Sequence, residues 1–249
     1  TLRDPKFAVK MKQNGDNQTL PEKYGGHCKF LGWVHTFYPL LPPEKYFAEH
    51  PDWYSEINGK REYPLIAGSR ANAQLCLTNE EMRKELTRVA LEWIKADPSA
   101  DIISISQNDC ESRCECAKCI AIEKEEGSPA GPLIHFVNAV AEDVEKQYPN
   151  VLVETLAYEY TIKPPLHIKP RRNVLIRLCT DGNDFAQPIE SEANRKFQEY
   201  ARGWSRISRN IFVWDYRANF ANLLLPNPNL HTLAANLRFF VKTNAVGVF

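Results

Sequence analysis

The feature that most constrains the fold is the alternation of short apolar segments with amphipathic helical patterns along the chain. Seven segments have the apolar body of a buried strand, and they span residues 30–36, 74–78, 102–107, 151–158, 174–179, 211–216 and 245–249. Between several of them, apolar side chains recur at helical spacing, in residues 79–93, 133–144, 192–207 and 230–241. Strands that alternate with helices in this way predict an α/β fold with a mainly parallel sheet.

The length and the number of strands favour a TIM-type (β/α)8 barrel. The 249 residues suit one barrel domain over residues 1–249, and seven candidates account for most of its eight strands. The first strand would lie before or near Thr1, and the chain stops within the apolar run 245–249. We therefore expect an incomplete barrel within a longer protein, with the first strand and the sequence beyond the eighth strand cut off. A doubly wound open sheet is the competing architecture, although no G-x-G-x-x-G turn follows any strand.

Composition argues against two classes of partner. The chain has 31 basic and 31 acidic residues, mixed throughout, and its formal net charge is +0. A nucleic-acid-binding protein would carry a basic stripe, so we expect no nucleic acid partner. No apolar run reaches the ~18 residues of a membrane-spanning helix, and no signal peptide is visible.

The sharpest candidate for catalysis is the polar end of the strand predicted at residues 102–107. Asn108 and Asp109 follow this strand directly, and Glu111 comes two residues later. Parallel α/β proteins place their chemistry at such strand ends, and burial there favours the protonated form of a carboxyl group. Asp109 is therefore the candidate general acid, Asn108 its polar neighbour and Glu111 the alternative acid. The competing interpretation is a loop cap, a common use of Asn-Asp.

Aromatic and acidic side chains recur where the other strand candidates end. They are His35, Tyr158, Tyr160, Asp181, Trp214, Asp215 and Tyr216. Aromatic faces stack on pyranose rings, while carboxylates on neighbouring strand ends can supply an acid and a base for cleavage of a glycosidic bond. Any single aromatic residue could instead be packing at the rim, but five polar strand ends together favour a carbohydrate site.

A cysteine cluster with the spacing C-x3-C-x-C-x2-C follows the central strand end. Its members are Cys110, Cys114, Cys116 and Cys119. Four thiols at this spacing could hold a structural zinc ion, form loop disulfides in an oxidising compartment, or remain reduced. The other three cysteines, Cys28, Cys76 and Cys179, are expected to be core thiols. We expect no cofactor to be required for catalysis.

Several motifs along the chain, in this order, resemble one protein family. They are His35–Pro43, His50–Tyr54, Gln74–Thr78, Ser104–Asp109 with its cysteine tail, Glu126–Gly131, Thr155–Tyr158, Ile176–Cys179 and Trp214–Tyr216. The family is the domain of unknown function numbered 4838, which is common in Bacteroidota and overlaps glycoside hydrolase family 163. The resemblance implies a TIM-barrel catalytic domain related to those of α-glucuronidases and hexosaminidases, normally placed after a small α/β domain.

The resemblance also implies an activity. Family 163 enzymes are endo-β-N-acetylglucosaminidases acting on N-glycans, so we expect a retaining, substrate-assisted glycoside hydrolase with a glycan or glycoprotein substrate. Under that scheme Asp109 is either the general acid or the carboxylate that orients the acetamido group. A periplasmic, outer-membrane-associated or secreted location follows. An exo-acting α-glucuronidase-like enzyme, with Arg177 or Arg217 binding a uronate, and a non-catalytic carbohydrate-binding barrel are the alternatives. One departure is residues 180–185, where the family pattern has a Glu-Cys pair and this chain offers Asp181 or Asp184.

Overall fold

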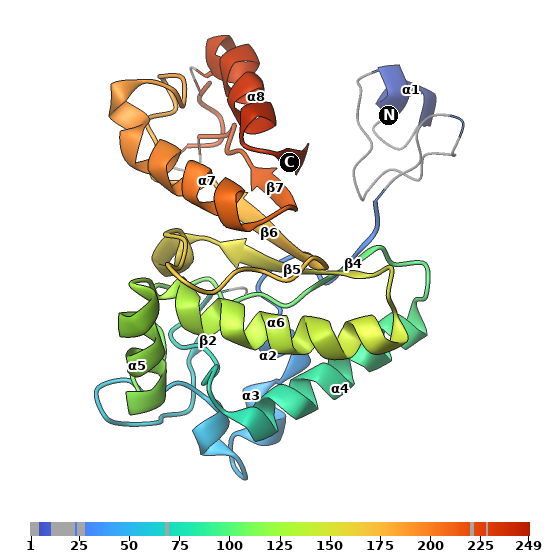
Figure 1. The fold of residues 1–249 in the computed structure, drawn as a ribbon, viewed down its shortest axis with the longest axis vertical. Coiled ribbons are helices and arrows are strands. Elements are labelled where there is room, and N and C mark those ends of the chain that lie inside the picture. The colour runs from blue at the N-terminus through green and yellow to red at the C-terminus, as the bar shows by residue number, and fades with distance from the viewer. Residues whose placement is uncertain (1–4, 11–22, 24–27, 68–69, 220–221, 228) are drawn as a thin grey trace.

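The computed structural model of the protein describes residues 5–10, 23, 28–67, 70–219, 222–227 and 229–249 (Figure 1). Its centre is a six-stranded sheet in which all neighbouring strands run parallel. In order across the sheet, the strands are β1 (Phe30–Leu31), β4 (Ile102–Ser104), β5 (Leu152–Ala157), β6 (Val174–Cys179), β7 (Ile211–Trp214) and β8 (Ala245–Val248). The order of these described strands follows the chain and never reverses. This connectivity is that of a TIM-type barrel, because a doubly wound sheet reverses its order at a switch point.

Contacts between distant strands show that the sheet is curled. The ring of Trp33, just after β1, lies 6.0 Å from that of Trp214 in β7 and 4.9 Å from that of Phe249 after β8. In a flat sheet, β1 and β7 would be four strand spacings apart, or about 19 Å. Pairing among the described residues ends at β1 and β8, so the structure shows a six-stranded part of a barrel and not all eight strands. The first strand expected before or near Thr1 lies outside the described residues.

A buried ion pair occupies the concave side of this sheet. Arg177 of β6 and Glu154 of β5 are both 0% exposed, and their Nε and Oε1 atoms are 3.1 Å apart. The guanidinium of Arg177 stacks 4.0 Å above the ring of Trp33 and donates a hydrogen bond of 3.0 Å to its carbonyl oxygen. Arg177 thus joins β1 to β6 inside the barrel. The expectation that it could bind a uronate is wrong, because no part of its side chain reaches solvent.

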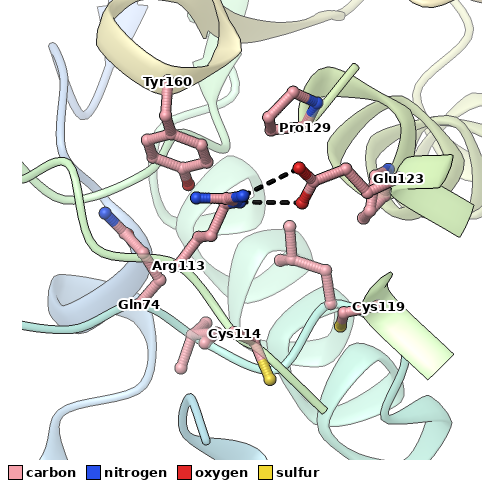
Figure 2. Close-up of a pocket in the computed structure, with 10 residues that line it drawn as sticks. Gln74, Arg113, Cys114, Cys119, Glu123, Pro129 and Tyr160 are labelled. Carbon is pink, nitrogen blue, oxygen red and sulfur yellow. Dashed lines mark hydrogen bonds and ion pairs between the residues drawn. The ribbon is translucent and has the colours of Figure 1, made fainter. Parts of the chain in front are cut away.

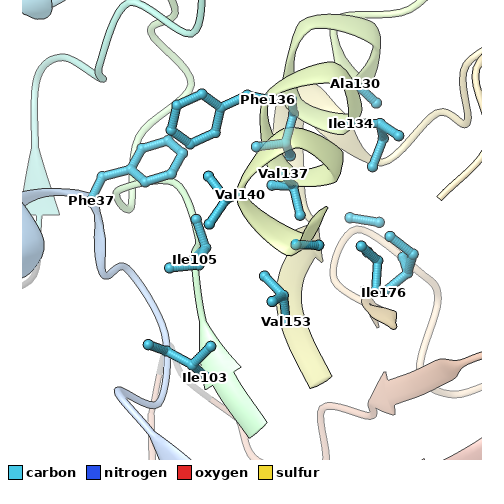
Figure 3. Close-up of a cluster of buried hydrophobic side chains, with 14 of the residues drawn as sticks. Phe37, Ile103, Ile105, Ala130, Ile134, Phe136, Val137, Val140, Val153 and Ile176 are labelled. Carbon is cyan, nitrogen blue, oxygen red and sulfur yellow. The ribbon is translucent and has the colours of Figure 1, made fainter. Parts of the chain in front are cut away.

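The four predicted helices are present as α4 (Glu80–Ala96), α6 (Ala130–Gln147), α7 (Arg195–Ile207) and α8 (Leu233–Lys242). A further helix that was not predicted, α5 (Ala117–Glu126), follows the cysteine loop. As expected for a helix start after Thr78, the Asn79 side chain caps α4 by accepting a hydrogen bond from the backbone N–H of Met82. Helix α6 buries Val137 and Val140 against the core of the sheet (Figure 3). None of the described helices is both long and apolar enough to cross a membrane.

Two predicted strands differ from the structure. Residues 74–78 form no strand, and within them only Leu75 makes a bridge, to Tyr54. The segment belongs to the long excursion between β1 and α4, so its apolar residues are buried without joining the central sheet. The strand predicted at residues 30–36 ends at Leu31, because Gly32 turns the backbone with a φ of +63°.

Short elements make up the excursion and the remaining turns. They are α1 (Pro5–Lys10), α2 (Phe37–Leu40), α3 (Pro43–Tyr46), the hairpin β2 (Ile66–Ala67) and β3 (Arg70–Ala71), and 3-10 turns at Pro51–Trp53, Glu159–Thr161, Glu192–Asn194 and Leu230–Thr232. The excursion returns to the carboxyl end of β4, which positions it beside the candidate site.

Candidate active site at the strand ends

Asp109 and Tyr158 meet at the carboxyl ends of β4 and β5. The Tyr158 hydroxyl donates a hydrogen bond of 3.1 Å to Oδ1 of Asp109, and both side chains are partly buried. Burial raises the pKa of Tyr158, and the neighbouring carboxylates Glu159 and Asp109 raise it further. The phenol therefore keeps its proton and can donate it in a hydrogen bond. Two of the residues expected at the site, from neighbouring strands, are thus brought together.

Glu159 lies beside this pair and was not among the residues predicted for the site. It is partly buried and has a φ of +48°, a strained conformation for a residue with a side chain. Burial raises the pKa of its carboxyl group, and Asp109 adds like-charge repulsion, although the Tyr158 hydroxyl opposes the shift. Oε2 of Glu159 is buried and makes no hydrogen bond in the described structure. The sequence signal was its position as a carboxylate two residues after the end of β5.

Asp181 adds a third carboxyl group, from the end of β6. Burial raises its pKa, and Asp109 raises it further by repulsion. Its Oδ1 atom is buried without a hydrogen-bond partner among the described residues. Asp109, Glu159 and Asp181 therefore form a group of mutually repelling carboxyls at three adjacent strand ends, which we call the strand-end acid cluster. Buried acids with a raised pKa, such as Glu159 and Asp181, gather at functional sites.

His35 reaches the same end of the sheet from β1. Its φ of +56° aims the side chain toward the end of β4, where Nδ1 lies 2.8 Å from the carbonyl oxygen of Gln107. Because a carbonyl can only accept a hydrogen bond, Nδ1 carries the hydrogen, and in the neutral ring Nε2 is an acceptor. The His35 and Tyr158 rings are 6.1 Å apart, so the structure places His35 next to the strand-end acid cluster.

Asn108 and Glu111 occupy different surroundings from Asp109. The Asn108 side chain is 3% exposed and donates to the carbonyl oxygen of Ala73 at 3.0 Å, while its backbone N–H donates to Gln74. Asn108 therefore ties the loop that carries Asp109 to the excursion. Glu111 is exposed and acts on Glu159 only through charge.

The end of β7 brings aromatic rings to the site but no available carboxylate. Oδ1 of Asp215 accepts a hydrogen bond of 3.1 Å from Thr180, and Oδ2 forms an ion pair with Arg217. Arg217 is therefore occupied within the protein, which disfavours the uronate role expected for it. Trp214 packs inside the barrel and stacks against Tyr216, with ring centroids 5.8 Å apart. Tyr216 lies close enough to Asp181 for that carboxylate to raise its pKa, after burial and Cys179.

Tyr160 does not join the other aromatic residues. Its hydroxyl end points toward Arg113, in a hollow that is also lined by Gln74, Cys114 and Cys119 (Figure 2). Its hydroxyl is buried and makes no hydrogen bond in the described part of the chain. Although Tyr160 follows Glu159 directly, it faces the cysteine loop and not the barrel.

The four cysteines that cluster in the structure differ from the four predicted by spacing. The Sγ atoms of Cys76, Cys114, Cys116 and Cys119 all lie within 4.8 Å of one another, and all four residues are buried. Cys76, expected to be a core thiol, takes the place expected for Cys110. The Cys110 thiol contacts Gln74 and the carbonyl oxygen of Ala73 instead. The spacing could not reveal Cys76, which is 38 residues before Cys114.

The resemblance to a protein family that the sequence motifs indicated is confirmed by comparison with family models. The model of the domain of unknown function DUF4838 matches residues 2–249. The chain belongs to this family. A comparison with curated proteins found no match. Solved structures that it resembles include a GH36 alpha-galactosidase from Geobacillus stearothermophilus in complex with stachyose, at 13% identity and a TM-score of 0.46, and a family GH13_31 enzyme, at 13% identity and 0.43. The alignments cover 91% and 83% of this chain, which spans 28% and 46% of those two structures.

Proposed function

We propose that this member of the DUF4838 family carries the active site of a glycoside hydrolase. The observation that supports the proposal is the strand-end acid cluster of Asp109, Glu159 and Asp181, with the Tyr158 hydroxyl bonded to Asp109. Glycosidic bond cleavage uses two carboxyl groups, one protonated and one ionised. Because burial and mutual repulsion raise the pKa of Glu159 and Asp181, such a cluster favours one protonated acid beside one ionised carboxylate.

The finer proposal is a retaining endo-β-N-acetylglucosaminidase acting on N-glycans. The acetamido oxygen of the substrate attacks the anomeric carbon, the bond to the leaving oxygen breaks, and an acid gives that oxygen a proton. Water then attacks the anomeric carbon, opens the cyclic intermediate and returns a proton to the acid. Glu159 suits the acid, because its pKa is raised. Asp109 suits the carboxylate that orients the acetamido group, because it accepts a hydrogen bond from Tyr158.

The surrounding residues suit a carbohydrate ligand. Tyr216 offers an aromatic face near Asp181, and His35 offers a ring nitrogen near Tyr158. Asn108 would hold the Asp109 loop, and Glu111 and Asp181 remain the reserve acids. The substrate would be a glycoprotein or its glycan, and we propose a periplasmic, outer-membrane-associated or secreted location on that basis. The α-glucuronidase alternative is weaker, since Arg177 is buried and Arg217 is paired with Asp215.

The test is glycan release from a complex-type N-glycoprotein by the complete protein, followed by mass spectrometry. We expect release that leaves one N-acetylglucosamine on the protein. Glu159→Gln and Asp109→Asn should abolish it, whereas Glu125→Gln, which changes an exposed carboxylate of α5, should not. Failure of the folded protein to cleave N-glycans, chitobiose or uronate substrates would contradict hydrolysis and leave the carbohydrate-binding alternative.

A second substrate separates the two roles. An aryl β-chitobioside with a good leaving group needs no acid, so Glu159→Gln should keep activity on it while Asp109→Asn should not. The opposite pattern would make Asp109 the acid. Release that survives both substitutions would move the acid to Glu111 or Asp181.

A further inference from the structure

We propose that Cys76, Cys114, Cys116 and Cys119 hold one structural zinc ion. This inference does not depend on the proposed hydrolase activity. The four residues come from two separate parts of the chain. Cys76 lies in the excursion after β1, while Cys114 and Cys116 lie in the loop after β4 and Cys119 in the first turn of α5. A metal ion at this place would join those two parts.

The sulfur positions fit a single tetrahedral ion. All four Sγ atoms lie within 4.8 Å of one another, and those of Cys76 and Cys116 are 3.7 Å apart. Four sulfurs around zinc at about 2.3 Å would be separated by roughly 3.8 Å from each other. The cluster therefore needs only a small contraction to bind an ion at its centre. Thiolate-only ligands favour zinc over magnesium or calcium, which prefer oxygen.

The surroundings of the cluster supply the contacts that thiolates need. The backbone N–H of Glu56 donates to Sγ of Cys114 at 3.4 Å, and the Thr78 hydroxyl lies 3.4 Å from Sγ of Cys119. The guanidinium of Arg61 lies close enough to Cys76 and Cys114 for its positive charge to interact with both. Four thiolates around Zn²⁺ would carry a net charge of −2, which these donors and this cation would partly offset.

The arrangement of the four thiols, clustered together and apart from the main core, argues against four ordinary core thiols. Each of the four cysteines is at most 9% exposed, and their polar partners are mainly one another and Thr78. They form a small buried cluster of their own, apart from the main hydrophobic core. An apolar core would gain more from branched side chains at these positions than from thiols.

The position of the cluster indicates that the metal would stabilise the loop next to the candidate active site. Gln74, two residues before Cys76, donates from Nε2 to the carbonyl oxygen of Asn108 at 2.9 Å and accepts from its N–H at 2.8 Å. A metal that fixes Cys76 against the loop of Cys114 would therefore hold the segment that carries Asp109. The site would be structural, since all four ligand positions are filled by protein.

The test is metal content measured by mass spectrometry on the complete protein, reduced, loaded with Zn²⁺ and freed of excess metal. We expect one zinc per chain in the wild type and in the matched control Cys110→Ser, and at least tenfold weaker retention in Cys76→Ser and Cys119→Ser. Loss in Cys110→Ser with retention in Cys76→Ser would overturn this ligand set. A wild-type chain that binds no metal under these conditions would overturn the site.

Cobalt substitution covers the case in which the serine variants fail to fold. The wild-type protein loaded with Co²⁺ should show the visible absorption of a tetrahedral tetrathiolate, and added zinc should remove it. A spectrum typical of six oxygen or nitrogen ligands would contradict the proposal, as would mass spectrometry that finds disulfides among these cysteines in metal-loaded protein.

Discussion

Glu154 and Glu159 are five residues apart, and burial raises the pKa of both, yet their neighbours are opposite in charge. Glu154, inside the barrel, faces the guanidinium of Arg177 at 3.1 Å. Glu159, at the strand end, faces Asp109 and Asp181. The comparison teaches that burial alone does not mark a reactive carboxyl group. The sign of the nearest charge separates an acid that holds the fold together from one suited to chemistry.

The largest effect should come from removing the cation of the interior pair. Arg177→Met leaves Glu154 buried without its partner, and we expect it to lower the free energy of unfolding by about 3–5 kcal/mol. Urea unfolding measures this loss. The double variant Arg177→Met/Glu154→Gln should recover most of the loss, because no uncompensated charge is then buried. Equal losses in the single and double variants would show that stacking on Trp33, and not charge, makes Arg177 necessary.

A third buried carboxylate, Glu126, sharpens the comparison because backbone N–H groups stabilise its negative charge. It is 3% exposed and accepts hydrogen bonds from the N–H groups of His167 and Ile168. Although burial opposes the shift, these bonds and His135 lower its pKa. We expect Glu126→Gln to cost about 1–3 kcal/mol of stability at neutral pH. Glu125→Gln, on the exposed side of the same helix, should change stability by less than about 0.5 kcal/mol.

The pH dependence of that cost follows from the lowered pKa. The folded protein binds the Glu126 proton less tightly than the unfolded chain, so the stabilisation is present above the ordinary pKa of about 4.3 and is lost as the pH falls through the lowered value. The difference between wild type and Glu126→Gln in chemical unfolding should shrink in acid. A difference that is constant with pH would show that the carboxylate charge contributes nothing.

These interior features also show what the sequence could predict. The apolar runs at residues 151–158 and 174–179 form β5 and β6, as predicted. A short, continuously apolar segment is stable only when both of its faces are buried, and the middle of the sheet provides that burial. Residues 74–78 look the same locally but cross the end of β4 without pairing there. Their position depends on the bonds from Gln74 to Asn108, 34 residues away, which no local pattern contains.

The site was predictable only in part, for a similar reason. Asp109, Tyr158 and Asp181 could be placed together because parallel strands end at one edge of the sheet. Glu159 was missed because its importance comes from a left-handed backbone and from neighbours on other strands. Arg177 was misassigned because its strand gave no sign of the aromatic side chains that enclose it.

The smallest effect on stability should have the opposite sign. Glu159→Gln removes a carboxylate that the folded state disfavours, so we expect a gain of up to about 1 kcal/mol at neutral pH, limited by solvent screening. Because the folded-state pKa is raised, this gain should be full above that pKa and disappear as the pH falls below the unfolded value. Chemical unfolding at several pH values measures it. A loss of stability at neutral pH would mean that Glu159 is held by a favourable partner.

The central claim is that the strand-end acids repel one another, and carboxyl titration by carbon NMR tests it most directly. The signal of Glu159 is assigned by comparison with Glu159→Gln, and its pKa is measured in the wild type and in Asp109→Asn. We predict a pKa above the ordinary value of about 4.3 in the wild type, and a lower pKa once the charge of Asp109 is removed. An ordinary or lowered pKa that is unaffected by Asp109→Asn would contradict the account.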